Sequence, residues 1–228
     1  MQEIHESWNN FLLTVNSKEI INCIKKNNDV FYPNEENIFK FMKNDLSKIK
    51  YVLYGQDPYV GINKDGEPFA TGDAFKVNGL TSWQQSTKKK SVTNILKSLY
   101  CLKYHKTKSI SEIRKELLNN EFILPPDQLF ESWEKQGVLL LNYSLTVGDK
   151  PGSHFEYWDD FSKKLIMYMM EYNPNIRFIL WGNDAQNFFS KIINDDSKIY
   201  KDVHPVNKEF YEHNKTFKKI KDINWYGI

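Results

Sequence analysis

The chain has 228 residues, of which 40% are hydrophobic and 15% aromatic, which is enough for a folded core and unlike a disordered chain. Its formal net charge of +2 neither requires nor excludes a nucleic-acid partner. The first ten residues lack the basic and apolar regions of a signal peptide, and no apolar run approaches a membrane span. We therefore expect a soluble protein of the cytoplasm, or of the nucleus in a eukaryotic or viral setting, with no membrane partner.

The two cysteines, Cys23 and Cys101, lie far apart and match no metal-binding spacing, so we expect free, buried thiols in a reducing compartment. No cluster of Cys, His and carboxylate residues resembles a zinc or iron site, and we expect no metal. The absence of repeats and low-complexity linkers favours one domain.

The N-terminal part of the chain has apolar residues at helical spacing over 8–15, 18–26 and 36–42. The first buried strand is predicted at 51–54, before a polar loop. A helix over 92–102 follows, with Ser91 placed to cap it, and helical structure is expected in part of 103–120 and over 128–135.

Three further apolar runs predict strands at 138–142, 177–181 and 199–203, and the residues between them predict helices at 158–172 and 185–193. Strands that alternate with helices favour a parallel sheet covered on both faces. We therefore expect an α/β protein, a three-layer α/β/α sandwich with a central, mainly parallel four-stranded sheet.

Polar side chains follow each predicted strand, at the point where the apolar run ends. They are Asp57, Asn142, Asn183 and His204. Because the carboxyl ends of parallel strands meet at one edge of a sheet, these groups should lie close together. A carboxylate, two amides and an imidazole at one edge favour an active site over four unrelated turns.

Five short motifs follow one another along the chain. They are Gly55-Gln56-Asp57-Pro58-Tyr59; Ala70-x-Gly72-x-x-Phe75; Trp133-x-x-Gln136-Gly137 leading into Val138–Asn142, with Leu145-Thr146-Val147; Leu180-Trp181-Gly182 with Ala185-Gln186; and His204-Pro205. In this order they resemble the uracil-DNA glycosylases, a widespread cellular and viral family. The likeness extends over nearly the whole chain. It implies a single domain over 1–228, with an N-terminal helical part at 1–50 and a catalytic core at 51–228.

The resemblance implies a monofunctional DNA N-glycosylase that hydrolyses the bond between uracil and deoxyribose, without lyase activity and without a metal or organic cofactor. The nucleotide must leave the base stack, and the sugar then gains positive charge while uracil leaves as an anion. Asp57 would orient the attacking water. His204, kept neutral, would donate a hydrogen bond to uracil O2, assisted by the backbone amide of Gln56.

Recognition of the base is implied at three further positions. Asn142 would pair with the uracil N3–H and O4, a pattern that cytosine reverses. Phe75 would stack on the flipped ring, and Tyr59 would exclude the thymine methyl group at C5. The DNA phosphates would be bound by Ser91, Asn183 and Lys90; Lys88, Lys89 and Lys90 stand where the family has prolines, which should strengthen salt-dependent binding.

Two segments depart from the family pattern. Val60 replaces the usual histidine after the Tyr of the first motif. The sequence His204-Pro205-Val206-Asn207-Lys208 lacks both the phosphate-binding serine and the leucine that enters the DNA stack in the family. We therefore expect an active enzyme that relies less on inserting a side chain into the DNA stack and works well on single-stranded or loosened DNA.

Two alternatives remain open within this fold. One is a glycosylase for a different modified base, against which Tyr59 and Asn142 argue. The other is a DNA-binding adaptor, because poxvirus relatives with shortened loops also serve as polymerase processivity subunits. The expected partners are uracil-containing DNA, single- or double-stranded, and a proteinaceous inhibitor or a replication partner. The protein itself is expected to be a monomer.

Overall fold

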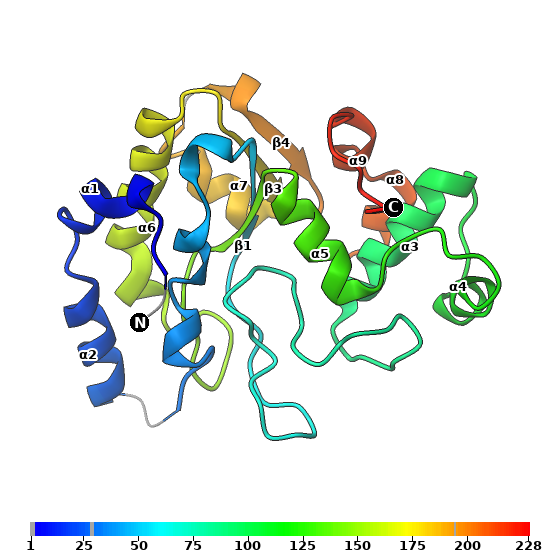
Figure 1. Cartoon of the computed structure of the whole chain (residues 1–228), viewed down its shortest axis with the longest axis horizontal. Coiled ribbons are helices and arrows are strands. Elements are labelled where there is room, and N and C mark those ends of the chain that lie inside the picture. The colour runs from blue at the N-terminus through cyan, green and yellow to red at the C-terminus, as the bar shows by residue number, and fades with distance from the viewer. Residues whose placement is uncertain (1–2, 28–29, 194) are drawn as a thin grey trace.

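A four-stranded parallel sheet lies at the centre of the protein, in the strand order β2-β1-β3-β4 (Figure 1). The structure is a computed structural model that describes residues 3–27, 30–193 and 195–228. The strands are β1 (Tyr51–Gly55), β2 (Val138–Asn142), β3 (Arg177–Trp181) and β4 (Ile199–Asp202). All three pairings are parallel, so the predicted sheet is confirmed, with strand limits within one residue of the prediction.

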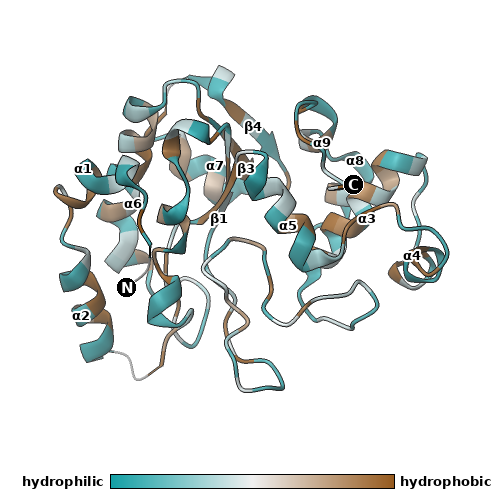
Figure 2. Cartoon of the chain, viewed as in Figure 1, coloured by the Kyte–Doolittle hydropathy of each residue, from teal (hydrophilic) through white to brown (hydrophobic). Residues whose placement is uncertain are grey.

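Both faces of the sheet are covered, which explains why the inner strands are continuous apolar runs rather than alternating ones. Leu53, Leu140 and Ile179 point into one core, and their neighbours Val52, Leu139 and Phe178 point into the other. The edge strand β4 is only half-buried and includes polar residues, which Figure 2 colours teal.

Helices form the two outer layers, as Figure 1 shows on either side of the sheet. One layer shares a core with Val52 and contains α1 (Asn9–Leu12), α2 (Ser17–Asn27), α6 (Phe155–Tyr172) and α7 (Asn183–Phe189). The other shares a core with Leu53 and contains α3 (Lys90–Tyr104), α4 (Ile110–Leu117), α5 (Pro126–Lys135), α8 (Lys208–His213) and α9 (Thr216–Lys219). The predicted three-layer sandwich is confirmed. No helix in the described ranges is both long and apolar enough to cross a membrane.

Three local predictions were wrong. The helix expected at 36–42 is two short 3-10 segments, η2 (Glu35–Asn37) and η3 (Lys40–Lys43), because Ile38 and Phe41, three residues apart, also suit a period of three. Ser91 does not cap α3: the helix begins at Lys90, and the Ser91 side chain is buried in its first turn. Cys23 is exposed rather than buried, although both thiols are free.

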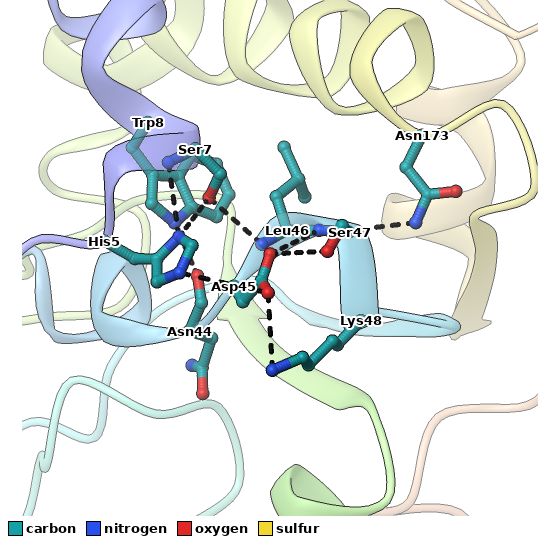
Figure 3. A network of polar contacts seen from close by, with 9 residues as sticks. All are labelled: His5, Ser7, Trp8, Asn44, Asp45, Leu46, Ser47, Lys48 and Asn173. Atoms are coloured by element: carbon teal, nitrogen blue, oxygen red, sulfur yellow. Dashed lines mark hydrogen bonds and ion pairs between the residues drawn. The ribbon is translucent and has the colours of Figure 1, made fainter.

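The N-terminal segment is attached by hydrogen bonds near the amino ends of the strands, opposite the polar loops (Figure 3). The His5 ring bonds to the Ser7 hydroxyl at 3.0 Å, and Ser7 Oγ accepts the Leu46 N–H at 3.1 Å. The Trp8 indole N–H donates to the Asn44 carbonyl at 2.8 Å. Trp8 also belongs to the core shared with β1, so we propose that the N-terminal part and the sheet form one domain. The remaining 3-10 segments are η1 (Glu6–Trp8), η4 (Leu46–Lys48) and η5 (Asp196–Lys198).

Candidate active site

The carboxyl ends of the four strands meet in a continuous series of contacts. Gly55, the last residue of β1, pairs with Asn142, the last residue of β2. Gly182, directly after β3, donates its N–H to the Asp202 carbonyl at the end of β4, at 2.9 Å. His204 follows two residues later and packs on Gly182. The predicted convergence of polar groups at one edge is therefore what the parallel register produces.

Asp57 lies two residues beyond β1 with its carboxyl group partly buried. Its Oδ2 accepts the Gly152 N–H at 3.1 Å, whereas Oδ1 is buried and has no hydrogen-bond partner among residues that the structure describes. Burial raises the pKa of Asp57, and the Gly152 N–H and the nearby Ser144 hydroxyl lower it. One carboxylate oxygen is thus fixed by the protein, and the other is available to a water molecule.

Asn142 is held against the backbone of β1 and is only 3% exposed. A Cβ on Gly55 would lie 2.3 Å from Asn142 Oδ1, so the absence of a side chain at Gly55 makes room for the carboxamide. Its amide makes no hydrogen bond within the described parts of the chain, which leaves its donor and acceptor available to a ligand.

Phe75 is positioned by contacts with β2 and β3. Its neighbour Ala74 donates its N–H to the Leu140 carbonyl of β2 at 3.3 Å, and the Phe75 ring packs on Trp181 of β3 at 5.2 Å between centroids. Phe75 has a φ of 64°, which is a strained conformation for a bulky residue. Such outliers gather at binding sites, where the surroundings hold them in place.

His204 is placed by the turn that it begins. Its carbonyl accepts the Asn207 N–H at 2.9 Å, and its Nδ1 accepts the Val206 N–H at 3.2 Å. Because Nδ1 accepts a hydrogen bond, the proton of a neutral ring must be on Nε2, which can then donate to a ligand. Burial lowers the pKa of His204, and the Asp184 carboxylate raises it. Gly182, at a φ of 100°, provides the space: a Cβ there would lie 3.0 Å from His204 Cβ.

Tyr59 and Ser91 lie together where the first motif meets the start of α3. Both Tyr59 Oη and the Ser91 side chain are buried. Burial raises the pKa of the Tyr59 hydroxyl, and the Ser91 hydroxyl lowers it. Ser91 therefore lies near the Tyr59 hydroxyl, a neighbour that its predicted role at a phosphate did not suggest.

The other predicted DNA contacts are exposed. Asn183 begins α7, and Lys88 and Lys90 lie at the start of α3. Gln56 is exposed too, and its carbonyl accepts the Ser144 N–H at 3.0 Å, which ties the loop after β1 to the residues after β2.

Three residues that support the site were not identified from the sequence. Gly152 contributes only a backbone N–H to Asp57, and Asp184 lies near His204 and influences its pKa. Asn94 of α3 donates its amide to the Pro205 carbonyl at 2.6 Å and so anchors the turn that contains His204. A sequence signal existed only for Asp184, because it follows a predicted strand.

Beside the loop after β1 lies a hollow of about 270 Å³, between Gln56 and α7. None of Asp57, Asn142 and His204 lines it. Nowhere in the described ranges do three His, Cys, Asp or Glu side chains gather as a metal site would require.

The sequence of residues 43–225 matches the model of one protein family, described as the uracil DNA glycosylase superfamily. The chain belongs to that superfamily. The match covers both the strand-end motifs and the elements that carry them.

Two bacterial uracil-DNA glycosylases are similar to this member of the superfamily over most of its length. A uracil-DNA glycosylase of Fusobacterium nucleatum is 31% identical over 246 residues, covering 99% of this chain and 97% of its own. One from Coxiella burnetii is 34% identical over 195 residues, covering 82% of this chain and 73% of its own.

Solved structures of two other family members share the fold. The enzyme of Nitratifractor salsuginis has a TM-score of 0.71 at 23% identity and covers 91% of this chain and 86% of its own. Mimivirus uracil-DNA glycosylase has a TM-score of 0.65 at 23% identity and covers 89% of this chain and 69% of its own. A mimivirus variant with a TM-score of 0.67 was solved in complex with UGI.

Proposed function

We propose that this chain is a uracil-DNA glycosylase, which hydrolyses the N-glycosidic bond of deoxyuridine in DNA and leaves an abasic site. The observation that carries the proposal is the arrangement of Asp57, Asn142 and His204 at one edge of the sheet. Each presents an unpaired atom of the type that the reaction needs: a carboxylate oxygen, an amide and an Nε2–H.

The reaction separates charge, and the site has a group for each sign. In our mechanism Asp57 Oδ1 accepts a hydrogen bond from the attacking water and stabilises the positive charge on the sugar. His204 Nε2–H and the Gln56 backbone amide stabilise the negative charge on uracil O2. A neutral, fixed donor suffices there, and the lowered pKa of His204 keeps the ring neutral at physiological pH.

Base selection follows from the hydrogen-bonding pattern of Asn142. Its carboxamide accepts from uracil N3–H and donates to O4, whereas cytosine would leave both amide groups unpaired in a buried position. A mismatch of this kind is worth roughly 10⁴-fold in discrimination. Phe75 stacks on the extruded ring, which contributes about 1–3 kcal/mol per base, and Tyr59 limits the space at C5.

Further properties belong to the same proposal. The partner is uracil-containing DNA, which Ser91, Asn183 and Lys90 contact at the phosphates. The enzyme is monofunctional, acts as a monomer in the cytoplasm, or in the nucleus if its host has one, and is open to a proteinaceous inhibitor. The complex of the mimivirus relative with UGI supports the last point.

The test uses an oligonucleotide with a single uracil, incubated with the protein and then treated with alkali. We expect scission at uracil, none in a matched oligonucleotide with cytosine at that position, and none before alkali. Asp57→Asn should slow the reaction by about 10²–10⁴-fold, the usual contribution of a positioned acid–base group. A wild-type protein that releases no uracil, or an unchanged rate in the variant, would contradict the proposal.

A further inference from the structure

The side chain of Lys89 does not point to solvent like those of its neighbours. Its Nζ lies 4.3 Å from the centroid of the Phe69 ring and 4.9 Å from that of Tyr59, and it donates a hydrogen bond to the Val60 carbonyl at 3.2 Å. Lys88 and Lys90, on either side, are exposed. The half-buried Lys89 is therefore the one lysine of the run that packs against the protein.

These contacts join three segments that are distant in sequence. Lys89 is the residue before α3, and Tyr59 and Val60 belong to the loop after β1. Phe69 lies in the segment between that loop and Phe75. Phe69 is itself fixed, because its N–H donates to the Gly61 carbonyl at 3.0 Å. The ammonium group thus links the tyrosine loop to α3.

The charge of Lys89 is held by ring faces and a carbonyl rather than by a carboxylate. Burial lowers its pKa, and no acidic side chain in the described parts of the chain offsets that effect. Aromatic faces attract a cation more strongly where water is excluded. An ammonium in this position restricts the Tyr59 ring from one side, while Ser91, two residues further on, lies at its hydroxyl end.

We propose that Lys89 is a positioning residue for Tyr59 and thereby sets the discrimination of the site against pyrimidines substituted at C5. This inference rests on the proposed function, in which the Tyr59 ring lies against C5. A lysine in this role contacts no phosphate, so Lys89 differs in function from Lys88 and Lys90, although the three are adjacent. The expected binding of DNA phosphates by this run is then limited to the two exposed members.

The experiment compares the release of uracil and of 5-bromouracil, whose bromine is close to a methyl group in size, from otherwise identical single-stranded oligonucleotides. Lys89→Met keeps the length of the side chain and removes its charge. We expect the ratio of kcat/KM for uracil to kcat/KM for 5-bromouracil to fall by about tenfold. This is the lower end of the discrimination that one methyl-sized group provides in a pocket. Lys89→Arg retains a cation and a hydrogen-bond donor, and should keep the ratio near that of the wild type.

Lys88→Met and Lys90→Met are the matched controls. Each should leave the ratio unchanged and reduce the slope of log K against log salt by about 0.7, the value for one phosphate contact on a single strand. If Lys89→Met behaves like these controls, with an unchanged ratio and a reduced slope, Lys89 is a phosphate ligand and the inference is wrong. Phe69→Leu, which removes one of the two rings, gives an independent variant should Lys89→Met fold poorly, and it should lower the ratio as well.

Failure of the proposed function can be distinguished from failure of the inference about Lys89. A wild-type protein that releases neither base contradicts the glycosylase assignment but not the position of Lys89. That position is read directly by NMR titration of the Lys89 side chain, which should lose its proton at a pH below the ordinary value for a lysine because burial lowers its pKa. Titration of Lys89 at the ordinary value for a lysine would overturn the placement, whatever the activity.

Discussion

The Asn142 carboxamide lies against Gly55, on the side where any other residue would carry its Cβ. The distance from that Cβ position to Asn142 Oδ1 would be 2.3 Å, well inside van der Waals contact. The two residues are also register partners at the ends of β1 and β2. The amide that we propose to read the base is thus located by the sheet itself, and not by a loop.

Gly55→Ala is expected to reduce uracil excision nearly as much as Asn142→Ala, although it substitutes none of the proposed site residues. The added methyl group must displace the carboxamide, and a displacement of about 1 Å can cost on the order of 10²-fold in rate. The measurement is kcat/KM on a uracil oligonucleotide, with far-UV circular dichroism to verify the fold. A folded Gly55→Ala protein with wild-type kinetics would show that Asn142 does not need this position.

Asn94→Ala should lower kcat more than it raises KM. The lost hydrogen bond to the Pro205 carbonyl, 2.6 Å long, holds the turn that begins at His204, and we place His204 at the charge that develops on the base. The expected loss is about tenfold, because the bond between His204 Nδ1 and the Val206 N–H remains. Asn94→Gln, which keeps an amide donor, is the control, and it should recover part of the loss.

Asp57→Asn should make the protein more stable at neutral pH while it removes activity. Burial raises the pKa of Asp57 above its ordinary 3.8, so ionisation is harder in the folded chain than in the unfolded one. The stability that this carboxyl contributes is present below its unfolded pKa and is lost as pH rises through the folded value. The variant should therefore melt at a higher temperature at pH 7, and the difference should vanish in acid. A variant that melts lower at pH 7 would contradict this sign.

Asp184→Asn should lower the pKa of His204. Burial already lowers that pKa, and the Asp184 carboxylate is the opposing influence, so its removal leaves burial less opposed. The direct measurement is the NMR titration of the His204 ring, assigned from the signal that is lost in His204→Gln. Substitution of Lys208 is a suitable negative control and should leave the pKa of His204 unchanged. Lys208 lies in the next helix and has Glu212 as its own partner. An upward shift in Asp184→Asn would exclude the assigned electrostatic effect.

Single-stranded and duplex substrates should be processed at comparable rates. The turn over His204, Pro205, Val206 and Asn207 is short, and its exposed apolar residue is Val206, which is 49% exposed. A β-branched side chain this close to the histidine is a poor substitute for a longer wedge, so the flipping step should gain little from it. The two rates are compared on one uracil strand, alone and annealed. A strong preference for the duplex would contradict the expectation.

The sequence predicted the sheet well because its signal is local. Val138–Asn142 and Arg177–Trp181 are apolar runs because both faces of each strand are buried. The parallel pairing of both strands with β1, and of β3 with β4, then places Asn142 and His204 at one edge. Contacts made by a backbone group cannot be predicted from the residue types in the sequence. The Gly152 N–H reaches Asp57 across 95 positions, and any residue other than proline would offer the same donor.

The orientation and burial of individual side chains could not be predicted from the sequence either. Three adjacent lysines indicate a solvated face, yet the middle one lies between two rings. Ser91 was expected at the helix terminus because serine often caps helices, but its burial beside Tyr59 depends on how α3 packs on the loop after β1. Both outcomes are decided by tertiary packing, which overrides the local preference.

The location of the imidazole after β4 has a consequence for heat inactivation. This strand has four residues, pairs on one side only and is less buried than the others, so it should be among the first parts of the sheet to open on warming. Its opening would release the histidine, while the carboxylate after the inner strand β1 and the amide at the end of the fully buried β2 stay in place. Catalysis should then fail a few degrees before the protein melts, and the warmed protein should still retain affinity for free uracil.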